Sequence, residues 1–296
     1  MTYPPAGQAE ENALAMQPRW WQALNPAIYL ISVLPLFGVL LLAENLAWME
    51  GVVIATLAVV LLQHAINLFN DVSDWQLGAD THKFDSWVRV FAGNTRPVFL
   101  QGLISAVVGM ALGLLVLSWS GQYWILLVAI PMILLGYLYN AGKKPLSYTA
   151  LGEWVTGLCY GPGVFGCLYL LGTGELTLSG IAGMVTFASL AMALLLSHQP
   201  PQIETDAQAG KRTFAVRYGK VATCNTLLLL LLIAVISFTA ALWLAGRPSC
   251  AAVFISLTAV AAVFSLHDSI NPKSVLLTSS MVFVCTMLVS AISPLI

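Results

Sequence analysis

Three carboxylates stand close together in a chain that carries very little charge. Asp71, Asp74 and Asp80 fall within ten positions after a long apolar run, whereas all 296 residues include only 13 Asp or Glu and 12 Lys or Arg. Gly78, which tolerates a positive φ, permits a turn that brings Asp80 back toward the other two acids. Acids at the mouth of a membrane helix are costly unless they bind a cation, so the cluster predicts a functional site.

The polar residues around these acids share one face of a helix. Asn67, Asp71 and Asp74 fall at positions i, i+4 and i+7, and Asn70 lies four residues before Asp74. Carboxylate and amide oxygens, without Cys or His among them, suit a hard cation such as Mg²⁺, which commonly shares its coordination with substrate phosphates. The alternative is a solvated loop whose acids cap nearby helices. We favour the metal site because the acids begin while the helix is still inside its apolar stretch.

A second polar segment, residues 198–219, combines acids with bases. Two consecutive prolines end or kink the preceding apolar run, and a short helix is expected from the second proline to Gly210. Glu204 and Asp206 on this helix are candidates for a second cation site. The bases that follow suit phosphate oxygens, or they simply anchor the cytoplasmic side of a membrane protein. They are Lys211, Arg212 and Arg217.

The composition is that of an integral membrane protein. The chain is 59% hydrophobic and 8% charged, with a mean hydropathy of +0.85, whereas a soluble domain carries about 25% charged residues. The formal net charge of −1 argues against a nucleic-acid partner, because there is no broad basic surface. A membrane span needs about 20 apolar residues. Nine stretches approach that length: 26–43, 50–69, 98–118, 123–140, 153–171, 178–199, 221–245, 250–266 and 274–294.

These stretches predict an all-α membrane protein, with about nine transmembrane helices in a bundle around one cavity that opens to the cytoplasmic side. Residues 1–18 read as a polar tail without the apolar core of a signal peptide, and residues 19–296 as a single transmembrane domain. With nine spans, 11 of the 12 basic residues fall on the side of the N-terminus, which the positive-inside rule places in the cytoplasm. We therefore expect a multi-pass protein of the cell inner membrane.

The same topology places both polar segments on the cytoplasmic side, where they can form one site. Acids, bases and an apolar bundle beneath them suit a ligand with a diphosphate head bridged by Mg²⁺. The rest of that ligand is a long apolar tail that lies among the helices. No obligate protein partner is indicated.

Two segments of the sequence resemble a known family. Residues Asn70 to Asp80, which read NDxxDxxxGxD, and residues 210–219, which read GKRTFAVRYG, resemble the UbiA superfamily of membrane aromatic prenyltransferases. Residues 139–153 resemble the branch that prenylates 1,4-dihydroxy-2-naphthoate in menaquinone synthesis. The likeness extends from residue 19 or so to the C-terminus.

The resemblance implies Mg²⁺-dependent transfer of a polyprenyl group from a prenyl diphosphate to a small aromatic acid, at a site made by the two acidic loops. In one departure, Gln202 stands where relatives usually have an aspartate, although its amide oxygen can still coordinate a metal. The implied metal ligands are Asp71, Asp74, Asp80, Gln202, Glu204 and Asp206. The implied diphosphate-binding residues are Asn70, Arg96, Lys211, Arg212 and Arg217.

The residues expected to act in catalysis are Asn67, Asp71, Asp74, Tyr139 and Lys143. The ring of Tyr139 can stabilise a carbocation, although an interfacial aromatic residue needs no such role. Lys143 is a candidate for holding the acceptor carboxylate. Glu153, at the start of the fifth span, either favours a helix N-terminus or contacts the acceptor.

Three alternatives stay open at this point. One is a related transferase that uses another prenyl donor or acceptor. The second is a cation transporter, although polar or broken helices near the midplane are typical of a transport path, and here the charges gather at one face. The third is a non-catalytic protein that binds prenyl diphosphate, which the substitution of an acid by Gln202 motivates.

Overall fold

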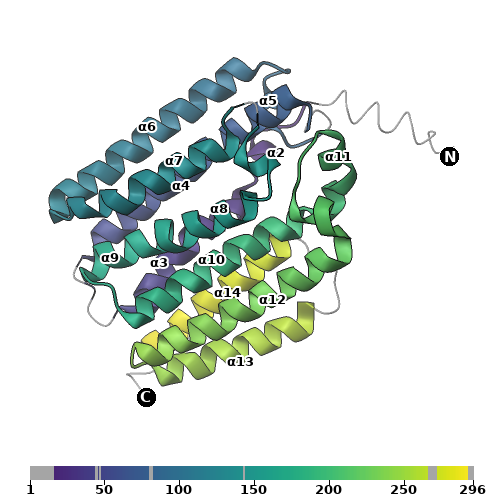
Figure 1. Ribbon diagram of the computed structural model, residues 1–296. Coiled ribbons are helices and arrows are strands. Elements are labelled where there is room, and N and C mark those ends of the chain that lie inside the picture. The colour runs from purple at the N-terminus through teal and green to yellow at the C-terminus, as the bar shows by residue number, and fades with distance from the viewer. Residues whose placement is uncertain are drawn as a thin grey trace.

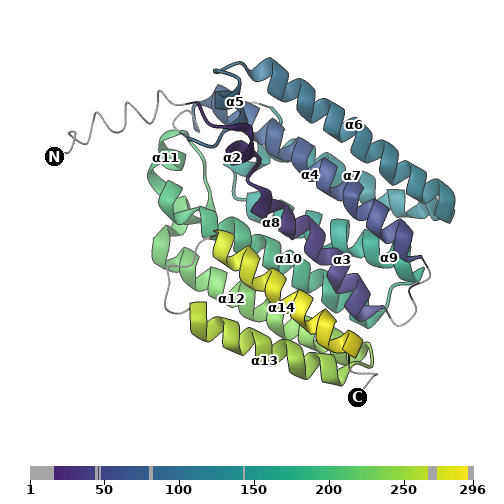
Figure 2. The same cartoon turned by 180° about the vertical axis from the view of Figure 1, so that it is seen from behind.

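The structure is a computed structural model that describes residues 17–43, 46, 48–79, 83–142, 144–265 and 272–292. Two predicted site residues, Asp80 and Lys143, lie outside the described residues. Every regular element in these ranges is a helix, as the apolar runs predict, and the long helices lie side by side as a bundle (Figures 1 and 2).

The long helices coincide with the predicted spans, although α4 and α12 extend beyond them at the polar segments. They are α3 (Leu30–Leu42), α4 (Met49–Leu77), α6 (Thr95–Ser120), α7 (Leu126–Asn140), α10 (Leu178–His198), α12 (Phe214–Leu244), α13 (Pro248–Ser265) and α14 (Pro272–Ile292). The fifth predicted span is one continuous rod built from α8 (Gly152–Leu158), the π-helix η4 (Cys159–Gly166) and α9 (Cys167–Thr173). Pro162 lies inside the π-helical part, and an interruption of the α-helical ladder is expected there because proline has no backbone N–H.

Seven helical segments in the described part of the chain are long and apolar enough to cross a membrane. The shorter apolar stretches Pro248–Val263 and Ser274–Val289 coincide with the eighth and ninth predicted spans. The protein is therefore a multi-pass membrane protein, and the total of nine spans stays a prediction. The seven segments are Trp20–Leu42, Met49–Leu77, Thr95–Ser120, Tyr123–Asn140, Gly152–Thr173, Leu178–Gln208 and Phe214–Leu244.

The remaining helices are short and sit at the ends of the bundle. They are α2 (Trp20–Leu24), η1 (Pro26–Tyr29), α5 (Trp87–Val90), η2 (Tyr123–Ile125), η3 (Leu146–Tyr148), η5 (Pro200–Gln202) and α11 (Ile203–Gln208). Of these, α2, α5 and α11 gather at one end (Figures 1 and 2). The short helix predicted between the second proline and Gly210 corresponds to η5 and α11.

Two helical hairpins carry the polar segments. In the first, α4 packs closely on α6, where a Cβ at Gly109 would lie 3.0 Å from the backbone oxygen of Ala58. Small residues at such contacts let membrane helices approach each other. In the second hairpin, α10 packs along α12, and Thr186 is 2.8 Å from the hydroxyl of Ser237. Both hairpins present their connecting segments at the end where α5 and α11 lie (Figure 1).

Aromatic rings pack the second hairpin against the interrupted rod and α14. Phe165 of the interrupted rod stacks on Phe187 of α10, with ring centroids 4.8 Å apart. Phe238 of α12 and Phe283 of α14 continue the cluster at 4.6 Å. This contact fixes the second hairpin against the rest of the bundle.

A cavity of about 330 Å³ lies at the opposite end of the bundle, beside the start of α10 and the end of α12. The predicted cavity beneath the acidic segments stays a prediction.

Candidate active site

Asp71 and Asp74 of the first cluster lie in the last two turns of α4 rather than in a loop. The helix continues to Leu77 and ends at Gly78, whose φ of 82° forms a left-handed cap. This extension, by two turns beyond the predicted span, carries Asp71 and Asp74 on the buried side of the helix, with exposures of 6% and 2%. Buried carboxylates require partners for their charge.

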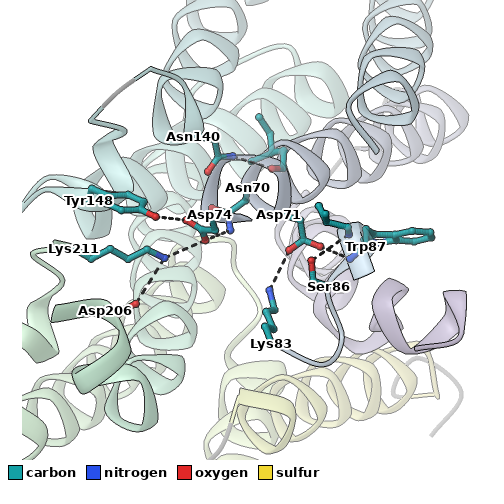
Figure 3. A network of polar contacts seen from close by, with 12 residues as sticks. Asn70, Asp71, Asp74, Lys83, Ser86, Trp87, Asn140, Tyr148, Asp206 and Lys211 are labelled. Carbon is teal, nitrogen blue, oxygen red and sulfur yellow. Dashed lines mark hydrogen bonds and ion pairs between the residues drawn. The ribbon is translucent and has the colours of Figure 1, made fainter. Parts of the chain in front are cut away.

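Asp71 is held by the segment that follows α4. Its Oδ1 atom lies 3.2 Å from Nζ of Lys83, and its Oδ2 atom accepts a hydrogen bond from the backbone N–H of Trp87 at 2.7 Å. Trp87 is the first residue of α5, which Ser86 caps through its side chain. The carboxylate therefore joins the end of α4 to the start of α5 (Figure 3).

Asp74 joins the two polar segments. Its Oδ2 atom accepts hydrogen bonds from Nδ2 of Asn70 at 2.8 Å and from Nζ of Lys211 at 3.1 Å. The hydroxyl of Tyr148 donates to its Oδ1 atom at 2.8 Å. The same ammonium group of Lys211 lies 3.7 Å from Oδ1 of Asp206, which is also buried (Figure 3). The lysine thus bridges one acid from each hairpin.

A turn between α7 and α8 fixes the place where Lys211 bridges Asp74 and Asp206. The carbonyl oxygen of Tyr148, in η3, accepts a hydrogen bond from the N–H of Arg212 at 3.1 Å, and the ring of Tyr148 lies 4.9 Å from Nζ of Lys211. The N–H of Lys211 in turn bonds the carbonyl of Asp206 at 2.8 Å and closes α11. Gly210, with φ of 78°, makes this reversal possible.

A second buried carboxylate lies nearby. Glu153, in the first turn of α8, accepts hydrogen bonds from the N–H of Phe214 at 2.7 Å and from the side chain of Gln199 at 3.1 Å. Its other oxygen lies 3.6 Å from the guanidinium of Arg217. In the structure Arg217 is therefore the partner of Glu153, and its guanidinium also lies over the ring of Phe214.

The other predicted site residues differ in exposure, and Tyr139 among them lies close enough to Asp74 and Asp206 to interact with their charges. Asn67 and Gln202 are half-buried, and so is Tyr139 at the end of α7. The exposed ones among them are Arg96 in the first turn of α6, Glu204 in α11, and Arg212. The structure brings together Asn70, Asp71, Asp74, Asp206 and Lys211.

Two residues in this site, Lys83 and Tyr148, had no role in the sequence interpretation. Lys83 is one of the 11 basic residues that the predicted topology places on the side of the N-terminus. Tyr148 follows a Pro-Leu-Ser sequence that favours a tight turn, but its contact with Asp74 spans 74 residues. No local pattern indicates a pairing over that distance.

The donor set suits Mg²⁺. Asp71, Asp74 and Asp206 provide carboxylate oxygens, and Asn70 provides an amide. Within the described ranges, no group of three His, Cys, Asp or Glu residues has the arrangement of a metal site by itself. Mg²⁺ usually takes one or two carboxylates and completes its shell with water and substrate phosphates. These residues therefore fit an ion that is shared with a phosphorylated ligand.

Comparison with known proteins agrees with this chemistry. Residues 32–288 match the UbiA prenyltransferase family. The 2-carboxy-1,4-naphthoquinone phytyltransferase of Synechocystis sp. is 32% identical over 217 residues, which cover 71% of this chain and 69% of that protein. The 1,4-dihydroxy-2-naphthoate octaprenyltransferase of Bacillus subtilis is 26% identical, over 72% of this chain and 70% of that protein.

Solved structures show the same fold at low sequence identity. A UbiA homolog from Archaeoglobus fulgidus bound to DMAPP and Mg²⁺ superimposes with a TM-score of 0.65 and 16% identity, covering 91% of this chain and 96% of that one. The apo structure of a UbiA homolog from Aeropyrum pernix K1 gives a TM-score of 0.68 and 17% identity, covering 90% of this chain and 98% of that one.

Proposed function

Because the chain belongs to the UbiA prenyltransferase family and is a membrane-bound transferase, we propose that it transfers a polyprenyl group from prenyl diphosphate to 1,4-dihydroxy-2-naphthoate, with Mg²⁺, in menaquinone biosynthesis. The observation that supports this proposal best is the contact of Lys211 with both Asp74 and Asp206. It places one cation and two carboxylates from separate hairpins where a metal–diphosphate head would bind. The naphthoate acceptor is inferred from the names of the two relatives.

In this proposal the acids hold the metal and the bases hold the phosphates. Asp71, Asp74 and Asp206 are the principal metal ligands, and Asp80, Gln202 and Glu204 complete the set. Mg²⁺ bound there supplies positive charge that stabilises the diphosphate as it leaves. The diphosphate-binding residues are Asn70, Arg96, Lys211, Arg212 and Arg217.

Lys211 is placed to exchange its contacts with the carboxylates of Asp74 and Asp206 for a contact with a phosphate of the prenyl donor. Its ammonium group has a flexible four-carbon stem and three donors, and it is mostly buried between two carboxylates, with its side chain 12% exposed. If Asp74 and Asp206 held Mg²⁺, the ammonium of Lys211 would be available to donate to a phosphate oxygen. The exchange requires only rotation of the side chain, because the backbone at Lys211 and Arg212 is fixed by Asp206 and Tyr148.

The reaction then forms a carbon–carbon bond. The bond between the allylic carbon and the diphosphate oxygen breaks, and the oxygen takes the electron pair. The electron-rich ring of the acceptor attacks the allylic carbon, and the attacked ring carbon loses its hydrogen as a proton. In the overall reaction a naphthoate acceptor also loses its carboxylate as CO₂, and the ring carbon that carried it takes up a proton. We assign cation stabilisation by its ring to Tyr139, a supporting role in the site to Asn67, and binding of the acceptor carboxylate to Lys143. The apolar spans exclude water that would otherwise capture the cation.

The site is proposed to face the cytoplasm, in the cell inner membrane. The support is the charge distribution, since 11 of the 12 Lys and Arg residues fall on the side of the N-terminus when nine spans are assumed.

A transfer assay tests the function. Membranes that contain the protein are incubated with Mg²⁺, a labelled polyprenyl diphosphate and a series of aromatic acids, with membranes lacking the protein as the control. We expect labelled product with 1,4-dihydroxy-2-naphthoate, and none when a chelator removes the metal. Product with another acceptor alone would assign a different substrate. Binding of the diphosphate without product from any acceptor would instead indicate a non-catalytic binding protein.

A further inference from the structure

Glu153 is a buried carboxylate that the proposed reaction does not use. It is 5% exposed, although it lies in a membrane protein with few charges. Its Oε1 atom accepts two hydrogen bonds, from the N–H of Phe214 at 2.7 Å and from Nε2 of Gln199 at 3.1 Å. Its Oε2 atom faces Arg217 at 3.6 Å. Oε1 is therefore held by two hydrogen bonds, whereas Oε2 pairs with the charge of Arg217 without a hydrogen bond.

These contacts cap the short helical segment Phe214–Tyr218 at the start of α12, which Gly219, with φ of 79° and ψ of 171°, separates from the long remainder of the helix. A helix leaves its first N–H groups without partners inside the helix, and here the first three each find a side-chain oxygen. Phe214 donates to Glu153, and Ala215 donates to Oε1 of Gln199 at 3.0 Å. Val216 donates to the hydroxyl of Thr213 at 3.4 Å. The first two acceptors come from other elements of the bundle, and the negative charge of Glu153 is favourable at a helix N-terminus.

The capped turn directly follows the residues that join the two hairpins. Lys211 is three residues before Phe214, and its N–H is held by Asp206. The intervening N–H of Arg212 is held by Tyr148. The short segment 211–213 is thus fixed at both ends, and Glu153 provides the fixed point on the α12 side.

We propose that Glu153 is a positioning residue, which sets the start of α12 and thereby holds the ammonium of Lys211 over Asp74 and Asp206. This inference rests on the proposed function, in which Lys211 binds the diphosphate of the prenyl donor. It gives Glu153 a role that differs from the two considered from the sequence, which were a favourable charge at the N-terminus of its own span and a contact with the acceptor. The carboxylate caps a helix that begins 61 residues later in the chain, and it is not the group that binds the acceptor.

The test compares Glu153→Gln and Glu153→Ala with the intact protein. Gln keeps the volume and one acceptor oxygen but loses the charge that faces Arg217, whereas Ala removes the cap. We expect Glu153→Ala to raise the KM for prenyl diphosphate about tenfold and Glu153→Gln to raise it about threefold, the range that follows from loss of one helix cap. The KM for the aromatic acceptor stays within about twofold.

Hydrogen exchange gives a readout that does not need turnover. In both variants the amides of residues 211–216 exchange faster than in the unchanged protein, while those of α6 do not change. Gln199→Ala, which removes the cap of Ala215 and a donor to Glu153, shifts the same amides. The matched control is Thr186→Val, because this buried threonine also links α10 to α12 but lies away from the site. It leaves both the exchange of residues 211–216 and the KM unchanged.

Three results would overturn the inference: unchanged exchange at residues 211–216 in Glu153→Ala, equal effects from Thr186→Val, or a raised KM for the acceptor alone. That last result would make Glu153 an acceptor ligand. If the unchanged protein transfers no prenyl group to any acceptor, the proposed function fails. The exchange data and direct binding of a prenyl diphosphate would still decide the role of Glu153.

Discussion

Asp74 has the most closely surrounded carboxylate in the site. It is 2% exposed, and it accepts hydrogen bonds from Asn70, Tyr148 and Lys211, which belong to three separate segments of the chain. Buried charges persist only where such partners satisfy them. Any change at this position therefore affects both the charge of the site and the contact between its two halves.

Asp74→Asn removes the negative charge of this side chain and leaves its size and shape nearly unchanged. The amide cannot balance the ammonium of Lys211, and it is a weaker ligand for Mg²⁺. We expect turnover to fall by at least about 100-fold, the effect typical of losing one group that stabilises transition-state charge, while circular dichroism still shows a folded helical protein. Glu175→Gln, at an exposed position beside the opposite cavity, is the control and retains full activity. Near-normal turnover in Asp74→Asn would remove the metal assignment.

Tyr148→Phe isolates one hydrogen bond. The ring stays beside Lys211 and the backbone contact with Arg212 is retained, whereas the hydroxyl that donates to Asp74 is lost. A hydrogen bond of this kind contributes about 1 kcal/mol, or somewhat more when the acceptor is charged. We therefore expect a loss of about fivefold to tenfold in kcat/KM for prenyl diphosphate. A loss as large as that in Asp74→Asn would mean that the hydroxyl itself takes part in the reaction.

The helix α4 sets the geometry of the first half of the site at the scale of elements. Because it continues to Leu77, its last two turns carry Asn70, Asp71 and Asp74 on a rigid rod. Gly78 ends the rod at φ of 82°, and a Cβ added there would meet no atom within 4 Å. The space is open, so only the backbone conformation disfavours another residue.

Gly78→Ala should therefore destabilise the protein by backbone strain alone. A residue with a Cβ in the left-handed region costs about 1–2 kcal/mol, which corresponds to a lower Tm of several degrees for a domain of this size. Thermal unfolding in detergent micelles measures the change. Gly78→Asn should cost less, because Asn adopts this conformation more readily. Gly113→Ala is the control, since this glycine lies within α6, has no positive φ and also has open space around it.

Elements could be predicted from the sequence more reliably than their contacts. The apolar runs predicted the long helices, because burial in a membrane requires their length and composition. The acids of α4 were recognised from their spacing. The contacts of Tyr148 with Asp74 and of Glu153 with Phe214 join residues 74 and 61 positions apart. Such pairings depend on how the hairpins pack, which neither local spacing nor propensity specifies.

The whole bundle has two different ends. One carries the polar segments, α2 with the exposed Trp20 and Trp21, and the junction of the hairpins. Tryptophan is typical of the membrane–water interface. The other end carries the short connections and the cavity lined by Tyr169, Glu175 and Ser179, among others. On the positive-inside rule we propose that the first end faces the cytoplasm.

Labelling with a membrane-impermeant thiol reagent tests this orientation. After the five native cysteines have been replaced, single cysteines are introduced as Glu204→Cys and Glu175→Cys, two exposed positions at opposite ends. We expect intact spheroplasts to label the second variant at once and the first only after permeabilisation. The reverse pattern would place the site on the outer side, whereas labelling of both in intact cells would indicate leakage or a mixed topology.

The bridge made by Lys211 also bears on the stability of the site when the proposed metal ion is removed. Acids that are gathered to coordinate an ion repel one another once the ion departs. Here Lys83 lies against Asp71, and Lys211 lies between Asp74 and Asp206, so the polypeptide carries internal counter-ions at the same carboxylates. Removing Mg²⁺ with a chelator should therefore stop catalysis without unfolding this end of the bundle, and resupplying the ion should restore activity.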